Sequence, residues 1–171
     1  IRIGKALEPF NLAWIEDPVI WHDIKGHKKV ADALLTPVAG GEDLYLVDGF
    51  REAIETQAFD VLHPDLLTSG GMLETKRIAD YGARYGLATA LHSCCSPIGF
   101  MANVHCGAAI NSLMAVEHHG LDVPFWEDLV TGLAPNYLDE GYVKVPDLPG
   151  LGLDLNLEAV KANLREPDTL F

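Results

Sequence analysis

Residues 59–93, FDVLHPDLLTSGGMLETKRIADYGARYGLATALHS, decide the fold, because they form one strand, loop, helix and strand unit with a titratable residue at each strand's exit. The apolar pair at residues 61–62 leads to Asp65, and the apolar run at residues 87–91 leads to His92. Two adjacent parallel strands deliver both side chains to the same rim. A carboxylate beside an imidazole fixes the ring tautomer and favours the imidazolium, so the pair predicts a general acid/base.

The same alternation of strand, polar exit and helix extends through most of the chain. Helices are predicted at residues 2–8, 24–35, 47–58, 72–85 and 98–110, and strands at residues 12–15, 37–39, 61–62, 87–91 and 113–116. Asp23 is the predicted N-cap of the second helix, and Gly86 ends the fourth. Residues 141–146 predict a further strand, and a turn-rich tail follows at residues 148–152.

Alternating strands and helices at this spacing predict a parallel α/β sheet with all strand exits on one edge. A (β/α) barrel of the TIM type and a doubly wound sheet both satisfy this pattern. The barrel is favoured because every strand exit carries a polar or acidic residue and because no Gly-x-Gly-x-x-Gly follows the first strand. A complete barrel needs roughly 250 residues. The five units therefore predict the later part of a barrel, in one partial domain over residues 1–171.

The composition restricts the partners and the compartment. At 49% hydrophobic residues, and without an apolar run of transmembrane length, the chain predicts a packed core and no membrane span. Its formal net charge of −13 argues against nucleic acid and against anionic membrane surfaces as partners. Three cysteines, two of them adjacent, argue against a disulfide framework, so we expect a cytoplasmic protein.

Carboxylates follow four of the predicted strands: Glu16, Glu42, Asp65 and Glu117. Oxygen-rich sites suit Mg²⁺, which binds a few carboxylates together with waters and substrate oxygens. Glu16 and Glu42 are one strand-helix unit apart, so we expect them to be neighbours around the rim. Successive side chains of a strand point to opposite faces, and the sequence does not fix which face each residue takes. Asp17 and Asp43, the acidic neighbours of Glu16 and Glu42, are therefore alternative candidates for the same positions.

These residues also have ordinary structural explanations. Asp65 alone would cap a loop, His92 alone would be a strand-end histidine, and the glutamates would pair with lysines. Zinc is not favoured, because the adjacent cysteines and adjacent histidines lack the spaced ligand pairs of structural zinc sites. Four other histidines are interpreted as surface or packing residues: His63, His105, His118 and His119.

The ordered motifs resemble the C-terminal barrel of the enolase superfamily, in the mandelate racemase and sugar-acid dehydratase subgroup. They are WIEDP at residues 14–18, GGED at 40–43, PD at 64–65 with GG at 70–71, and HS at 92–93. The resemblance implies that Glu16 and Glu42 are Mg²⁺ ligands. It implies that Asp65 and His92 form a general acid/base dyad. It also implies that Glu117 hydrogen-bonds the substrate carboxylate as this becomes an enediolate.

The implied activity is Mg²⁺-dependent removal of the proton next to a carboxylate. Because no lysine lies at residues 65–71, the resemblance favours the Asp-His branch over muconate-lactonising and dipeptide-epimerase enzymes. The Ser-Pro-Ile-Gly loop after His92 favours a dehydratase of sugar acids, which is a lyase, over a racemase, epimerase or cycloisomerase. The alternative from another class is a non-catalytic barrel fragment that acts only as an assembly partner.

The chain departs from the family pattern in what it lacks. One metal ligand, a second base of the Lys-x-Lys type, the first barrel strands and the N-terminal capping domain have no counterpart in residues 1–171. We therefore expect a fragment that is inactive alone, because its parallel edges are left unpaired. The complete protein is expected to be a homo-oligomer that acts on a small carboxylate, either a sugar acid or a hydroxy acid.

Overall fold

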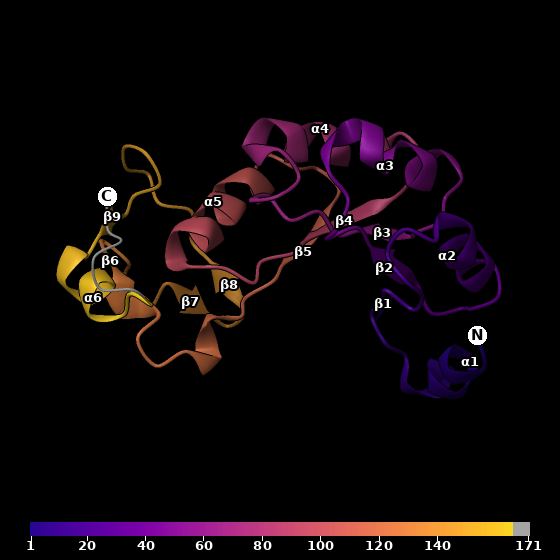
Figure 1. Cartoon of the computed structure of the whole chain (residues 1–171), viewed down its shortest axis with the longest axis horizontal. Coiled ribbons are helices and arrows are strands. Elements are labelled where there is room, and N and C mark those ends of the chain that lie inside the picture. The colour runs from indigo at the N-terminus through magenta and orange to yellow at the C-terminus, as the bar shows by residue number, and fades with distance from the viewer. Residues whose placement is uncertain (166–171) are drawn as a thin grey trace.

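The computed structural model describes residues 1–165 and contains a five-stranded parallel sheet (Figure 1). Its strands are β1 (Ile15–Glu16), β2 (Val38–Gly40), β3 (Val61–Leu62), β4 (Ala88–Leu91) and β5 (Leu113–Val116). They are hydrogen-bonded in the order β1-β2-β3-β4-β5, each to its successor along the chain. A doubly wound sheet reverses its strand order at a switch point. This order never reverses, so the sheet is an arc of a (β/α) barrel, as predicted.

The sheet is strongly curved. Adjacent strands lie about 4.8 Å apart, so a flat sheet would separate β1 from β5 by roughly 19 Å. Glu16 at the end of β1 and Glu117 after β5 nevertheless both approach Nε2 of His63, at 3.5 Å and 3.8 Å. The two outer strands therefore bend toward a common axis, as the strands of a barrel do.

Four helices connect the strands: α2 (Ile24–Ala31), α3 (Leu46–Glu55), α4 (Gly71–Ala83) and α5 (Pro97–Gly107). In Figure 1, α3, α4 and α5 lie along one side of the strands. Phe50 and Ile54, four residues apart on α3, are fully buried and belong to the same core cluster as Leu62 of β3. Asp23 caps α2 as predicted, because it accepts the amide N–H of Gly26 at 2.9 Å.

The first part of the chain differs from the prediction in two places. α1 (Arg2–Leu7) continues into a 3₁₀ turn, η1 (Glu8–Phe10). The strand predicted at residues 12–15 is found at Ile15–Glu16, so it shares only Ile15 with the prediction. The helix predicted to reach residue 35 ends at Ala31. The chain turns there because Glu8 Oε1 accepts the Leu35 amide N–H at 2.9 Å and because Pro37 disfavours helical geometry at the residue before it.

Beyond β5 the chain forms short elements: η2 (Gly120–Asp122), η3 (Glu127–Leu129), β6 (Val130–Thr131), β7 (Leu138–Asp139), β8 (Tyr142–Val143), β9 (Asp154–Leu155) and α6 (Leu157–Ala162). β7 pairs with β8 and β6 pairs with β9, both antiparallel. The strand predicted at residues 141–146 is reduced to β8. β7, the β6–β9 pair and α6 were not predicted, because two-residue strands and a six-residue helix are too short to show a period. Among the helices of residues 1–165, none combines the length and apolarity needed to cross a membrane.

Candidate active site

The five candidate residues lie at the carboxyl edge of the sheet. Glu16 ends β1, Glu42 comes two residues after β2, Asp65 comes three residues after β3, and His92 and Glu117 follow β4 and β5 directly. A parallel β-bridge between Asp65 and His92 extends the pairing of β3 with β4. All five residues are therefore at one mouth, at the carboxyl ends of the strands.

The Asp65 and His92 pair has the geometry of a general acid/base dyad. Nδ1 of His92 lies 2.8 Å from Oδ2 of Asp65, and Oδ1 of Asp65 accepts the Leu67 amide N–H at 2.7 Å. Since an ionised carboxylate only accepts, the proton in this contact is on Nδ1, and Nε2 is left to face the other carboxylates. Only 16% of the His92 side chain and 11% of the Asp65 side chain are exposed, so solvent screens the contact weakly.

The surroundings tune both members of the dyad. The hydrogen bond to Asp65 raises the pKa of His92, partial burial opposes the increase, and attraction to Glu117 and Glu42 adds to it. Burial raises the pKa of Asp65, but the hydrogen bonds from His92 and from backbone amides outweigh it, so that the pKa is lowered. The pair is therefore an ionised Asp65 carboxylate beside a His92 imidazole whose basicity is increased.

Glu42 and Glu117 face the second nitrogen of this dyad. Nε2 of His92 lies 3.0 Å from Oε2 of Glu42 and 3.7 Å from Oε2 of Glu117. Burial raises the pKa of Glu42, attraction to His92 lowers it, and repulsion from three nearby carboxylates raises it, with an increase as the net result. A cation placed among these carboxylates would relieve that repulsion.

Both oxygens of Glu117 already have partners. Oε2 accepts the Ser93 amide N–H at 3.0 Å, and Oε1 lies 2.7 Å from Nε2 of His119. Burial raises the pKa of Glu117, but these hydrogen bonds and the nearby histidines lower it overall. Glu117 is therefore an acceptor in this arrangement. A donor role toward a substrate would need its pKa to rise, which an anion bound beside it would cause.

The structure shows which of Glu16 and Asp17 points into the mouth. Oε2 of Glu16 accepts the indole N–H of Trp14 at 3.3 Å and lies 3.5 Å from Nε2 of His63. Asp17 points elsewhere, with its buried Oδ1 3.5 Å from Nε2 of His27 in α2. Glu16 therefore faces the mouth, and Asp17 packs against the helix behind it.

His63 lies at the centre of the site, although the sequence interpretation treated it as a surface or packing residue. Only 2% of its side chain is exposed, and Nδ1 lies 2.8 Å from the carbonyl oxygen of Ala90. Its ring meets that of His92 edge-on, with 5.4 Å between ring centroids. One signal for it was in the sequence: His63 precedes Asp65 by two residues, and alternate residues of an extended chain share a face.

The mouth supplies the oxygen atoms that a hard cation prefers. Glu16 and Glu42 come from the neighbouring strands β1 and β2, which pair in parallel. Within residues 1–165, no group of three or more His, Cys, Asp or Glu side chains is arranged to hold a metal ion. Two carboxylates still fit Mg²⁺, which fills its remaining positions with waters, substrate oxygens or a further ligand. The donor set is therefore suited to Mg²⁺ as a partial site.

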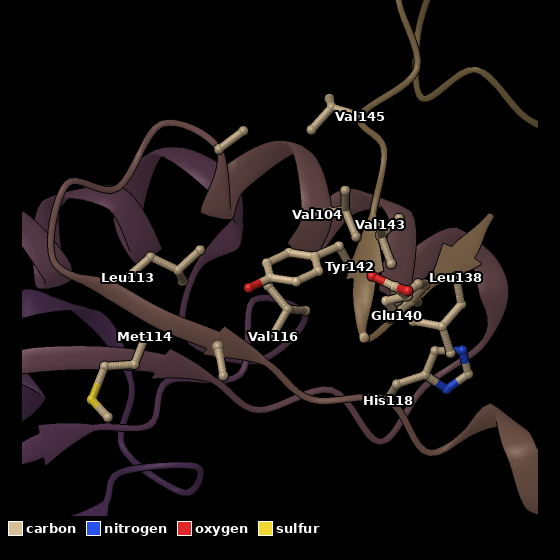
Figure 2. Close-up of a pocket in the computed structure, with 14 residues that line it drawn as sticks. Val104, Leu113, Met114, Val116, His118, Leu138, Glu140, Tyr142, Val143 and Val145 are labelled. Atoms are coloured by element: carbon tan, nitrogen blue, oxygen red, sulfur yellow. The ribbon is translucent and has the colours of Figure 1, made fainter.

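A cavity of about 580 Å³ lies apart from this mouth, between α5, β5 and the β7–β8 hairpin (Figure 2). Its walls are mostly apolar and include Val104, Leu113, Val116 and Tyr142. None of the five candidate residues lines it. The five candidate residues therefore lie at the carboxyl edge of the sheet and not in this cavity.

Comparison with known proteins agrees with the fold and the motifs. The family described as enolase C-terminal domain-like matches residues 1–160. D-xylonate dehydratase from Haloferax volcanii is 41% identical over 99% of this chain, and D-galactonate dehydratase family member RspA from Pantoea ananatis is 33% identical over 95% of it. A mandelate racemase/muconate lactonizing enzyme-like protein from Rubrobacter xylanophilus superposes with a TM-score of 0.92, at 34% identity over 96% of this chain and 42% of its own.

The matched relatives are longer proteins. The chain spans 41% of the length of the Haloferax volcanii protein and 38% of that of the Pantoea ananatis protein. The match to the family nevertheless covers nearly the whole of residues 1–171 and all five candidate residues. The chain therefore belongs to the enolase C-terminal domain-like family of the enolase superfamily.

Proposed function

We propose that the protein containing this chain removes the proton next to the carboxylate of a sugar acid and expels the β-hydroxyl as water, as a sugar-acid dehydratase does. The observation that carries the proposal is the dyad of Asp65 and His92, whose Nε2 faces the same mouth as Glu42 and Glu117. The 41% identical relative named D-xylonate dehydratase supports a sugar acid as the substrate.

His92 acts first as a base in this mechanism. Its unprotonated Nε2 takes the proton from Cα, while Asp65 holds the ring through Nδ1 and stabilises the imidazolium that results. A positioned group of this kind contributes about 10²- to 10⁴-fold in rate. Because the pKa of His92 is raised, its base form predominates only above that pKa.

Removal of the Cα proton leaves a dianionic enediolate that needs stabilisation. Glu16 and Glu42 would hold Mg²⁺, with a further ligand from outside residues 1–171. When bound, Mg²⁺ supplies electrostatic stabilisation to the substrate carboxylate. Glu117 binds the same carboxylate once the anion beside it has raised its pKa enough for it to donate a hydrogen bond.

Dehydration then uses the same nitrogen. His92 carries the former Cα proton on Nε2 and donates it to the β-hydroxyl oxygen as the bond from Cβ to that oxygen breaks. One molecule of water leaves, and the remaining enol rearranges to a 2-keto-3-deoxy acid. In an epimerase, His92 would remove the same proton and a second acid on the other side of the substrate would give a proton to the opposite face of Cα, so the product distinguishes the two activities.

The chain accounts for only part of such an enzyme. We propose that residues 1–171 form part of a C-terminal barrel domain, and that the first barrel strands and a capping domain complete the active site in the full-length protein. The capping domain would also read the distal end of the substrate. Residues 1–171 alone should then be inactive, because a metal ligand and a second base are missing.

Turnover by the full-length protein tests the proposal. The protein is incubated with Mg²⁺ and a panel of sugar acids that includes D-xylonate and D-galactonate, and 2-keto-3-deoxy acid is measured as its semicarbazone. We expect product from at least one acid, a requirement for Mg²⁺, and no product from His92→Asn. The matched control is His22→Asn, because His22 is an exposed histidine in the turn before α2 and should not affect the rate.

Three results would contradict the proposal or correct it. No product from any acid on the panel, or full activity in His92→Asn, contradicts the dehydratase assignment. An epimerised acid in place of the keto acid identifies a racemase or epimerase. Turnover by the isolated 171-residue chain contradicts the claim that the site needs residues from elsewhere.

A further inference from the structure

The buried ring of His63 has no role in the chemistry proposed above. Its Nδ1 lies 2.8 Å from the carbonyl oxygen of Ala90 on β4. A carbonyl oxygen only accepts, so the ring proton of this contact is on Nδ1 and the ring orientation is fixed from behind. The other nitrogen, Nε2, is buried and has no hydrogen-bond partner within residues 1–165. Buried polar atoms are usually paired, so an unpaired one aimed at a site calls for an explanation.

That nitrogen points between two of the candidate residues. It lies 3.5 Å from Oε2 of Glu16 and 3.8 Å from Oε2 of Glu117. The same ring packs edge-on against His92, with an interplanar angle of 78°. His63 directly follows β3, and its ring therefore contacts Glu16 at the end of β1 and two side chains that directly follow β4 and β5. One imidazole ring therefore links residues at the carboxyl ends of β1, β3, β4 and β5.

We propose that His63 is a positioning residue that sets the separation of Glu16 and Glu117 and the orientation of the His92 ring. Glu16 and Glu117 come from the two outer strands of the sheet, and no hydrogen bond between those strands holds them in register. The rigid imidazole, anchored through Ala90, supplies a polar atom at the point where both carboxylates approach. This inference rests on the proposed function, because it concerns the geometry of the same mouth.

The imidazole is suited to this task for two reasons. Its length and planarity keep Nε2 at a fixed distance from the Ala90 carbonyl, so that movement of β4 relative to the outer strands is limited. An N–H at Nε2 would donate toward carboxylate oxygens at 3.5 Å and 3.8 Å, where a leucine or phenylalanine would present only carbon. Outer partners that orient metal ligands typically contribute 10- to 100-fold in metal affinity or activity.

The test compares His63→Leu with His63→Gln in the full-length protein, using Mn²⁺ as the probe for the Mg²⁺ position. Mn²⁺ affinity is measured by electron paramagnetic resonance, and thermal unfolding is recorded in parallel. We expect His63→Leu to weaken Mn²⁺ binding about 10- to 100-fold. His63→Gln keeps a polar side chain and should stay within about threefold of wild type. His105→Leu is the matched control, because His105 bonds the Leu151 carbonyl at 3.3 Å and lies outside the mouth.

Each result has a clear meaning. Mn²⁺ binding by His63→Leu at the wild-type level overturns the positioning role. A wild-type protein that binds no Mn²⁺ and converts no sugar acid overturns the proposed function together with this inference. If His63→Leu fails to fold, ¹⁵N-histidine spectra of the wild type decide: Nδ1 must be protonated and Nε2 must shift when Mg²⁺ is added. An Nε2 signal that does not respond to Mg²⁺ overturns the inference.

Discussion

Replacing Asp65 by Asn tests the dyad at the atom that orients it. Asp65 Oδ2 accepts from Nδ1 of His92 at 2.8 Å, and both side chains are largely shielded from solvent. The asparagine keeps the volume but removes the negative charge, and its amide N–H₂ can donate to Nδ1 and so place the imidazole proton on Nε2. In that tautomer, His92 cannot take a proton from a substrate.

The smallest effect follows from the hydrogen bond that is lost. A hydrogen bond to a charged group contributes about 1.5–3 kcal/mol. At 1.36 kcal/mol for each tenfold change in rate, this loss alone corresponds to a decrease of about 10- to 150-fold in kcat/KM, and any population of the unproductive tautomer lowers kcat/KM further. The pKa of His92 is raised chiefly by Asp65, so the variant should also have a lower pKa and an acid limb of kcat/KM that moves to lower pH.

The assay is the pH dependence of kcat/KM for the full-length enzyme with its best sugar acid. Asp80→Asn is the matched control, because Asp80 pairs with Lys76 on the exposed side of α4 and has no contact with the mouth among the residues described. We expect Asp80→Asn to behave as wild type. The predicted role of Asp65 would be refuted if the plateau value of kcat/KM for Asp65→Asn stayed within threefold of wild type and the acid limb of its pH profile did not move.

Three further predictions concern the metal, acid stability and backbone. Glu42→Gln should weaken Mn²⁺ binding at least about tenfold, with little change in thermal unfolding, and unchanged binding would remove Glu42 from the ligand set. The lowered pKa of Asp65 means that its contribution to stability is present above its unfolded pKa of about 3.9 and is lost as the pH falls below it. Denaturant titrations between pH 2 and 6, roughly spanning that transition, should therefore give a shallower loss of stability on acidification for Asp65→Asn, and parallel curves would contradict this. Gly41→Ala should destabilise by about 1–3 kcal/mol in urea unfolding, because φ is +123° and the new Cβ would lie 2.6 Å from Phe50, whereas Gly49→Ala in α3 meets no atom within 4 Å and should be neutral or stabilising.

Much of the sheet could be predicted because each strand is short, apolar and followed by a polar residue. Strands at residues 61–62 and 113–116 were predicted with the bounds that the structure has. The spacing of Phe50 and Ile54 correctly gave the buried face of α3. The end of α2 was wrong by several residues, because a hydrogen bond from Leu35 to Glu8, distant in the sequence, decides where the chain turns.

The candidate site was less completely predictable. The strand exits of a parallel sheet share an edge, and this alone was enough to bring Asp65, His92 and Glu117 together. The choice between Glu16 and Asp17 required the parity of a two-residue strand, which no periodicity fixes. His63 was missed because its meaning depends on Ala90 and on two outer strands that only the curvature of the sheet brings close.

In the proposed mechanism, His92 is the group that removes the Cα proton. The decisive measurement is the exchange of that proton with deuterium from solvent, followed by ¹H NMR in the full-length protein with Mg²⁺ and a sugar acid. We predict exchange in the wild type, and a loss of about 10²-fold or more in His92→Asn, while Mn²⁺ binding is unchanged. Exchange at the wild-type rate in His92→Asn would contradict the assignment of the dyad and the mechanism built on it.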